Sequence, residues 1–240
     1  MTKVPSIVTT NLVLNLDASN PSSYPGSGVD WFDISGNSNN GTLTNGPTFN
    51  SANGGSIVFD GTNDYINNIG SVSSFSFIQN TALTTLSFWI KFNNTSNLEY
   101  ITGNTPTSAE KGFFLAKNIN GSLQISVFDG SGSGTNLINY TSPSGLFNDT
   151  NWHNYTITID KTINTNTIYK DGVLFSSGTG TGAWTLSSGN STRTLILGNI
   201  NNYFVLFLNG NVANYLIYNR PLTASEILQN FNATKSKFGL

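Results

Sequence analysis

The segment FLNGNVANYLIYNRPLTASEILQNF, residues 207–231, reads as a β-strand, a proline and then the start of a short helix. Thr223 can cap this helix, and Glu226 three residues later completes a capping box. Leu222 before the cap and Ile227 after it have the spacing of a hydrophobic staple. The segment therefore predicts a strand followed by one short C-terminal helix.

The predicted helix runs from about residue 224 to residue 234, and with its cap it forms a closing segment, 222–234. Ile227, Leu228 and Phe231 recur at helical spacing and predict one apolar face. A short helix with one apolar face must be buried against another element, so we expect it to dock against the rest of the domain.

Turn signals punctuate the chain before this segment at intervals too short for helices. Asp60-Gly61, Asn120-Gly121 and Asp171-Gly172 are of the kind that favours tight hairpins. Many short strands separated by such turns predict an all-β fold, a jelly-roll sandwich of two antiparallel sheets. The β-rich runs between turns predict strands at residues 12–16, 56–59, 85–92, 112–117, 123–128, 152–160, 167–170, 173–176, 193–198, 203–208 and 212–218.

The length of 240 residues suits a single β domain, 1–240, with residues 1–11 as an N-terminal arm. Strand 85–92 shows the alternation expected when one face is buried. Its two faces carry Leu86, Phe88, Ile90 and Phe92 on one side, and Ser87, Trp89 and Lys91 on the other.

Charged residues make up only 9% of the chain, and the formal net charge is −2. No block of basic residues is present, which argues against a nucleic-acid partner. No apolar run approaches the roughly 18 residues of a membrane-spanning helix, so we expect no membrane insertion. There are no cysteines, which excludes disulfides and thiolate chemistry. The N-terminal stretch has no apolar run long enough for a secretory signal, so we expect no classical export.

Three blocks of the sequence resemble the concanavalin A-like jelly rolls, specifically the laminin-G-like group. They are TLSFWIKF, WHNYTITIDKTINTNTIYKDGVLF and the segment 207–231 with its YNRPLTASEI. GSIVFDGTNDYI also matches a pattern of the family, and together these blocks span roughly residues 55–235. The resemblance implies a two-sheet jelly roll in which the closing helix is the end-piece of the family.

The front of the chain, residues 12–50, is similar to the start of laminin-G-like proteins common in tailed phages and environmental viruses. This resemblance implies a virion surface component, such as a capsid decoration, fibre or tail protein. Its partners would be the major capsid protein or other virion proteins. Such a protein would be a closed homo-oligomer on symmetry grounds.

Glycosidases of this fold class use paired carboxylates on one strand, in a Glu-x-Asp-x-x-Glu pattern, to flank the scissile bond. The glutamates of this chain are Glu99, Glu110 and Glu226, and none lies in that pattern. His153, the only histidine, follows Trp152 at the head of a strand, where a structural role is favoured over a Ser-His-Asp site. We therefore predict that the protein is not an enzyme.

Lectin sites pair an aromatic platform with hydrogen bonds from amides and carboxylates. Trp31, Trp184 and Tyr203 lie in or beside predicted loops, and Trp89 points away from the Leu86 face of its strand. These four aromatic residues are the candidates for contact with a glycan or a partner protein. For Trp89, packing beneath a covering loop is the stronger interpretation.

Several jelly rolls of this kind hold Ca²⁺ at a rim through Asp, Asn and backbone carbonyl oxygens. Asp33, Asp60 and Asp64 are the candidates for such a site. Aspartate and asparagine near glycine are also ordinary turn residues, which is the preferred interpretation. No pattern in the sequence requires a cofactor.

The main functional hypothesis is a non-catalytic virion structural protein, a phage capsid decoration or fibre-like surface component that can also bind cell-surface glycans. The alternative is a carbohydrate-binding module or adhesin without a virion role, and it rests on fold-level analogy. A glycoside hydrolase ranks third, because the carboxylate pattern argues against it.

Overall fold

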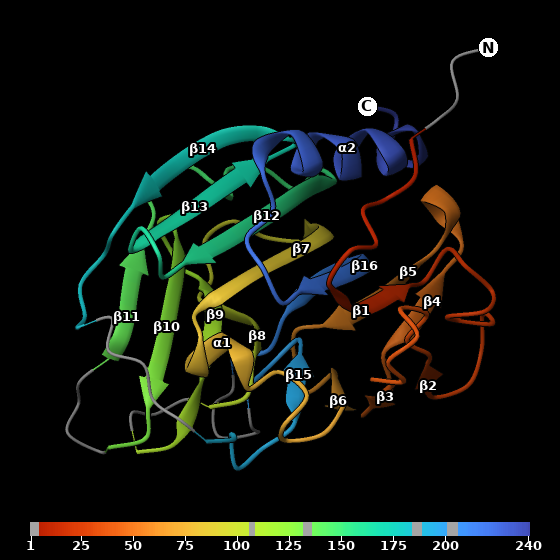
Figure 1. Cartoon of the computed structure of the whole chain (residues 1–240). Helices are drawn as coiled ribbons and strands as arrows, with labels where there is room; N and C mark the ends of the chain where they lie inside the picture. Colours follow the sequence, from red (N-terminus) through yellow and green to blue (C-terminus); the bar gives the residue numbers. More distant parts are fainter. Residues whose placement is uncertain (1–4, 106–108, 132–135, 184–188, 201–205) are drawn as a thin grey trace.

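The computed structural model describes residues 5–105, 109–131, 136–183, 189–200 and 206–240 (Figure 1). Within these residues, two antiparallel sheets of eight strands each pack face to face as a sandwich, which confirms the predicted all-β fold. In the first sheet β1 (Leu12–Asp17) pairs with β16, and the other strands follow the order β14 (Val173–Gly178), β13 (Thr165–Lys170), β12 (His153–Asp160), β7 (Leu83–Phe92), β16 (Asn209–Tyr218), β5 (Ser56–Asp60) and β4 (Thr48–Asn50).

The second sheet forms the opposite layer of the sandwich. Its order is β11 (Asn136–Thr141), β10 (Leu123–Asp129), β9 (Lys111–Lys117), β8 (Glu99–Gly103), β15 (Leu195–Leu197), β6 (Tyr65–Ile69), β3 (Gly41–Thr44) and β2 (Asp30–Trp31). The predicted strand at 203–208 is wrong over 206–208, which are not in a strand, and residues 203–205 lie outside the described part of the chain.

Strand β16, from the segment 207–231, pairs with three strands of the first sheet. One of its edges pairs with β7, and the register shifts between Val212 and Asn214. Its other edge pairs first with β5, over residues 209–212, and then with β1, over residues 214–218. Three strands from distant parts of the chain therefore meet on this one strand.

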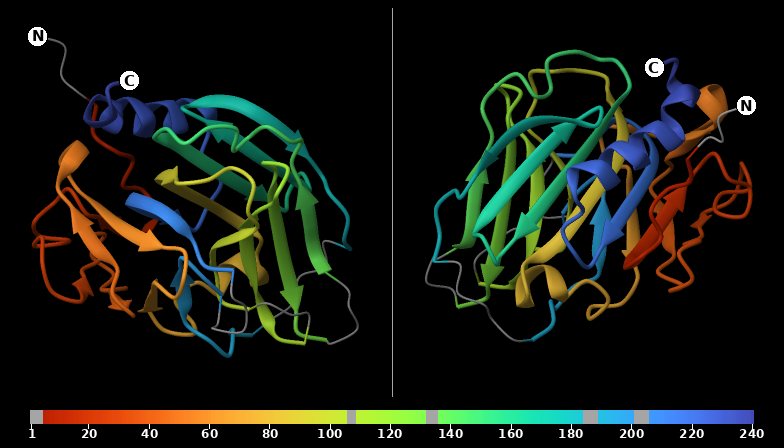
Figure 2. Two further views of the ribbon diagram at one scale, coloured as in Figure 1. Left: turned by 180° about the vertical axis from the view of Figure 1, so that it is seen from behind. Right: turned by 45° about the horizontal axis from the view of Figure 1, so that its top comes forward.

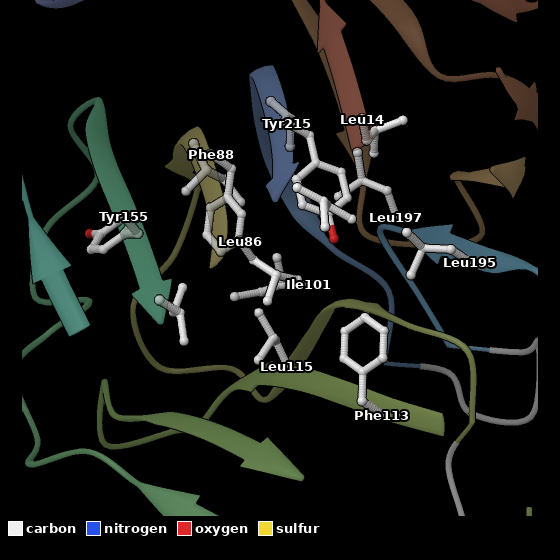
Figure 3. Close-up of a cluster of buried hydrophobic side chains, with 14 of the residues drawn as sticks. Leu14, Leu86, Phe88, Ile101, Phe113, Leu115, Tyr155, Leu195, Leu197 and Tyr215 are labelled. Atoms are coloured by element: carbon white, nitrogen blue, oxygen red, sulfur yellow. The ribbon is translucent and has the colours of Figure 1, made fainter. Parts of the chain in front are cut away.

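The main core fills the space between the sheets. The apolar face predicted for 85–92 lies in this core, because Leu86, Phe88 and Ile90 are fully buried. The expectation of only one buried face is wrong, because Ser87 and Trp89 on the other face are each 1% exposed. Figure 3 shows side chains from both layers pointing into the core, with Phe88 and Tyr215 on the first sheet facing Leu115 and Phe113 on the second. The rings of Phe88 and Tyr215 pack edge to face, with centroids 6.0 Å apart.

Helix α2 (Ala224–Thr234) has the predicted bounds and lies across the outer face of the first sheet, away from the core (Figure 2, right). The capping box is confirmed: Thr223 Oγ1 accepts a hydrogen bond from the Glu226 N–H, and the Thr223 N–H donates to Glu226 Oε2 at 2.9 Å. Leu222 and Ile227 are buried in one cluster, as a hydrophobic staple requires.

The predicted apolar stripe of this helix needs one correction. Ile227 and Phe231 are buried, but Leu228 is 45% exposed. Successive helical residues point about 100° apart. Leu228 therefore points away from the sheet. The buried face of the helix contains the polar residue Asn230 instead.

Asn230 connects the helix to the N-terminal arm, of which the structure describes residues 5–11. Its Oδ1 accepts a hydrogen bond from the Val8 N–H at 2.8 Å, and its Nδ2 donates to the Tyr218 hydroxyl at 3.0 Å. The same hydroxyl donates to the Val8 carbonyl oxygen at 2.9 Å. This closed set of hydrogen bonds explains how an amide is accommodated in an apolar contact.

Three further short helices were not predicted: α1 (Phe77–Asn80) and the 3₁₀ helices η1 (Ala52–Gly54) and η2 (Lys235–Phe238). Helix η2 follows α2 directly and folds Phe238 back onto the first sheet. Within the residues that the structure describes, no helix combines the length and apolar character needed to cross a membrane.

Candidate functional site

The structure buries two of the four aromatic candidates. Trp31 is fully buried in the main core, and Trp89 is 1% exposed. The Trp89 ring stacks on Phe238 and Phe231, and its indole N–H donates to Thr234 Oγ1 at 2.8 Å. Neither ring has a face open to a ligand. Trp89 was expected to pack beneath a covering loop, and in the structure the closing segment covers it.

The other two aromatic candidates, Trp184 and Tyr203, lie outside the described residues. Three open hollows, two of which adjoin, occur at the end of the sandwich where β7 ends and β8, β10 and β12 begin. We therefore describe the candidate site from the residues that line these hollows.

The Asp33 carboxylate accepts hydrogen bonds from the loop around it. Its Oδ1 accepts the backbone N–H groups of Asn15 and Ser35, both within 2.9 Å. Its Oδ2 accepts the Asn39 N–H and the Ser35 hydroxyl. These four hydrogen bonds use all the lone-pair directions of the carboxylate. Asp33 therefore holds its loop together and has no lone pair left to coordinate calcium.

Asp60 and Asp64 share one turn, in which the Asp60 N–H donates to Asp64 Oδ2 at 3.1 Å. Burial, and to a lesser degree the Asp60 charge, raise the pKa of Asp64 above its usual range. Two carboxylates in one turn fit a cation better than Asp33 does, but Ca²⁺ takes six to eight oxygens. Among the described residues no group of three or more His, Cys, Asp or Glu side chains gathers around a common point. Calcium binding stays a prediction for this turn.

The amide groove is the larger feature at this rim. It consists of two adjoining hollows, of about 290 and 480 Å³, which share Leu98 and Ile119. Its walls come from the segments that precede β8, β10 and β16. Its uncharged polar residues are Ser96, Asn97, Asn118, Asn120, Ser122, Thr141 and Asn209.

The apolar surface of this groove is formed by Leu98, Ile119, Leu206 and Phe207. Ile119 is 69% exposed, so it presents its side chain to whatever occupies the groove. Ser96 and Asn97 are exposed, and their side chains make no hydrogen bond with other described residues. The groove therefore offers free hydrogen-bonding groups beside an apolar floor.

One ion pair lies buried at the base of the groove. Glu99 and Lys117 are 2% and 0% exposed, with Oε1 and Nζ 3.6 Å apart. Glu99 also accepts hydrogen bonds from the Asn94 side chain at 2.7 Å and the Asn209 N–H at 3.1 Å. Burial raises the pKa of Glu99, and the Lys117 charge and these donors oppose the rise. The carboxylate is thus fully engaged in holding the rim segments together.

The second feature is the Trp152 cleft, a hollow of about 330 Å³. Lys91, Thr150, Asn151, Trp152 and His153 line it, and Phe238 and Leu240 close it. Trp152 is half-buried and packs on Phe238, with centroids 5.0 Å apart and 46° between the rings.

His153 lies between two carboxylates at the wall of this cleft. Its Nδ1 is 2.6 Å from Asp171 Oδ2, and its Nε2 is 3.0 Å from Asp149 Oδ1. Only the doubly protonated ring can donate to both partners. Burial alone lowers the pKa of His153, but the contacts with Asp171 and Asp149 outweigh burial and raise it. Both ring nitrogens are committed, which agrees with the structural role predicted for this residue.

The sequence reasoning missed both the amide groove and the Trp152 cleft as binding candidates. Trp152 was noted only as part of a Trp-His pair, and Lys91 only as a residue of the outer strand face. The signal for the amide groove was diffuse, because its polar residues come from segments far apart in the chain.

The chain was compared with known proteins. Residues 60–228, well over half of the chain, match the family model described as "Concanavalin A-like lectin/glucanases superfamily" (Laminin_G_3). No curated protein matches the sequence. The solved structures similar to this one include several receptor-binding domains of clostridial toxins.

The binding domain of Paraclostridial Mosquitocidal Protein 1 is 19% identical, with a TM-score of 0.67 over 94% of this chain and 52% of that chain. A structure of botulinum neurotoxin type C, whose cell entry is described as dependent upon interaction with two ganglioside molecules, is 14% identical. Its TM-score is 0.68 over 95% of this chain and 52% of that one. The chain thus spans about half the length of these toxin structures.

At this identity the likeness to the toxin domains concerns the fold. The family match rests on the sequence itself and covers both the strand blocks and the start of the closing helix. The similar structures are named as binding domains. The chain belongs to the concanavalin A-like lectin/glucanase superfamily, as a laminin-G-like jelly roll.

Proposed function

We propose that this protein is a carbohydrate-binding domain that holds an uncharged glycan segment in the amide groove. The observation that carries the proposal is the lining of the groove, in which amide and hydroxyl side chains surround Leu98, Ile119 and Phe207. Sugars present hydroxyl groups along their edges and C–H groups on their faces, so they need both kinds of surface.

The toxin domains support the proposal without identifying the sugar. The type C neurotoxin is described as interacting with gangliosides, which are glycan-bearing molecules. That protein is about twice as long as this chain, so a glycan site here is an inference for this chain's own residues.

The groove is built for binding rather than hydrolysis. A glycosidase needs two carboxyl groups placed on either side of the bond that breaks. The carboxylate in the groove lining is Glu99, which is buried and engaged by Lys117, Asn94 and Asn209.

A location on a virion surface stays a separate prediction. The similar structures named above are toxin domains, and they give no support for capsid or tail partners. Glycan binding is compatible with a decoration or fibre protein as well as with an adhesin. Mass spectrometry of purified particles distinguishes these two locations, since a virion component is present at a fixed stoichiometry.

The test of the proposed function is a glycan array followed by titration of the neutral glycans that bind. The variant is Asn97→Ala, which keeps the backbone contacts of this residue with Asn94 and Lys117 and removes only the free amide. We expect it to weaken binding by about tenfold, the effect of about 1.4 kcal/mol in free energy. Asn190→Ala is the matched control, because Asn190 is exposed and lies outside the amide groove and the Trp152 cleft. This variant should bind as the wild type does.

A further inference from the structure

We infer that the Trp152 cleft is a second binding site, specific for a sugar that carries a carboxylate, such as a uronic or sialic acid residue. This goes beyond the proposed function, which concerns uncharged sugars in the amide groove. The inference rests on one uncompensated cation, one available aromatic ring and free polar groups that line the same hollow.

Lys91 supplies the cation. It lies near the end of β7, on the outer face of the first sheet, and lines the cleft. Within the described part of the chain its side chain makes no ion pair, hydrogen bond or ring contact. Most other cations of the described residues are paired with carboxylates, namely Lys117, Lys170, Arg193, Arg220 and Lys237.

Among the side chains around the cleft, the other charges cancel. His153 and Lys170 are the positive groups, and both contact Asp149, while His153 also contacts Asp171. The two carboxylate side chains thus balance the charges of His153 and Lys170, and no carboxylate side chain balances the charge of Lys91. In a chain with so few charged residues, an unmatched ammonium in a partly enclosed hollow favours a negatively charged group on the ligand.

Trp152 supplies the platform for a sugar ring. Phe238 supports it, and the ring is only half-buried, so part of its surface faces the cleft. Its indole N–H makes no hydrogen bond with other described residues. Sugar rings place their C–H faces on such rings and their hydroxyls on the polar edge. The exposed Thr150 and Asn151 add a hydroxyl and an amide beside it.

The size and charge of the cleft define the ligand class. A volume of about 330 Å³ is at the small end of ligand pockets and suits one or two sugar rings. One free ammonium matches one carboxylate, whereas a densely sulfated chain needs a row of cations. The cleft therefore favours a glycan that ends in, or contains, a singly charged acidic sugar.

The test is an array that carries sialylated, uronate-containing and sulfated glycans beside their neutral counterparts, probed with wild-type protein and three variants. Lys91→Gln removes the free cation, and Trp152→Phe removes the indole N–H while keeping an aromatic ring against Phe238. Lys161→Gln is the matched control, because it makes the same charge change at the β12–β13 turn. Thermal melting of each variant confirms that the fold is retained.

We expect carboxylated glycans to bind the wild type and the Lys161→Gln variant. Lys91→Gln should lose about tenfold or more in affinity for them, which is the range expected for one charge-assisted contact. Neutral glycans should bind all of these variants equally. The inference is overturned if no carboxylated glycan binds, if Lys91→Gln binds them as the wild type does, or if sulfated glycans bind best. An array without any bound glycan contradicts the proposed function as well.

Discussion

Trp89 of β7 stacks on Phe238 of η2, with ring centroids 4.0 Å apart and 16° between the ring planes. These residues lie almost 150 positions apart, and their contact fixes η2, which follows the closing segment, to the outer face of the first sheet. Because Phe238 also packs on Trp152, the same contact shapes the Trp152 cleft. The end of the chain thus stabilises the fold and builds one of its candidate sites.

Phe238→Ala should therefore destabilise the protein. It removes a half-buried ring and uncovers Trp89, so we expect the free energy of unfolding to fall by about 1–3 kcal/mol, less than for a fully buried ring. Urea unfolding monitored by tryptophan fluorescence measures the loss. Phe32→Ala is the control, because Phe32 is 41% exposed and its loss should cost less. Equal effects of the two variants would contradict the role of the closing segment.

Glu226 predicts a dependence of stability on pH. Its hydrogen bonds with Arg220 chiefly, and with Thr223, lower its pKa from 4.5 to about 2. A carboxyl group whose pKa is lower in the folded state stabilises the fold above its unfolded pKa, and this contribution is lost as the pH falls through the folded value. The stability difference between wild type and Glu226→Gln should be full at pH 6 and should shrink between about pH 4.5 and 2. A difference that stays constant over this range would contradict the ion pair with Arg220.

The buried pair beneath the amide groove predicts an asymmetric pair of variants. Lys117→Met leaves the Glu99 carboxylate buried without its cation, which should cost about 3–5 kcal/mol. The double variant Glu99→Gln with Lys117→Met removes both charges and keeps an amide for the Asn209 N–H, so it should recover part of this loss. Chemical denaturation of both proteins tests this. A double variant no more stable than Lys117→Met would show that the two charges act independently.

The turn at Asp60 and Asp64 predicts a response to calcium. If it binds the ion, Ca²⁺ should raise the melting temperature relative to EDTA, because a ligand that binds the folded state stabilises it. Asp60→Asn should abolish this shift, and Asp33→Asn should leave it in place, since Asp33 is occupied by hydrogen bonds within its loop. A wild type whose melting temperature is the same in calcium and EDTA would exclude the site.

Much of the fold could be predicted from patterns that are local in the sequence. The alternation of Leu86, Phe88 and Ile90 is a property of one strand, and the box of Thr223 and Glu226 is a property of one helix start. The short strands β2, β3, β4, β6, β8 and β11 escaped prediction because their few residues are largely polar or are interrupted by glycine and asparagine. They become strands through pairing with neighbours, which a single segment does not encode.

The candidate site was less predictable than the fold. Exposure was expected for Trp31 because it lies among turn residues, yet the strand pairing of β2 with β3 turns it into the core. Lys91 and Trp152 meet only because β7 and β12 are paired and the end of the chain closes over both. Such a site depends on tertiary contacts between three distant segments, and no local pattern shows it.

The most direct test of the central claim is chemical-shift mapping of the ¹⁵N-labelled protein with a neutral oligosaccharide that binds on the array. The account predicts that the side-chain amide signals of Asn97 and Asn120, and the backbone signal of Ile119, shift with a common saturation curve. Signals of exposed residues at the opposite end, such as Asn164, should stay fixed. Failure to find any neutral glycan that binds, or shifts confined to residues outside the amide groove, would contradict it.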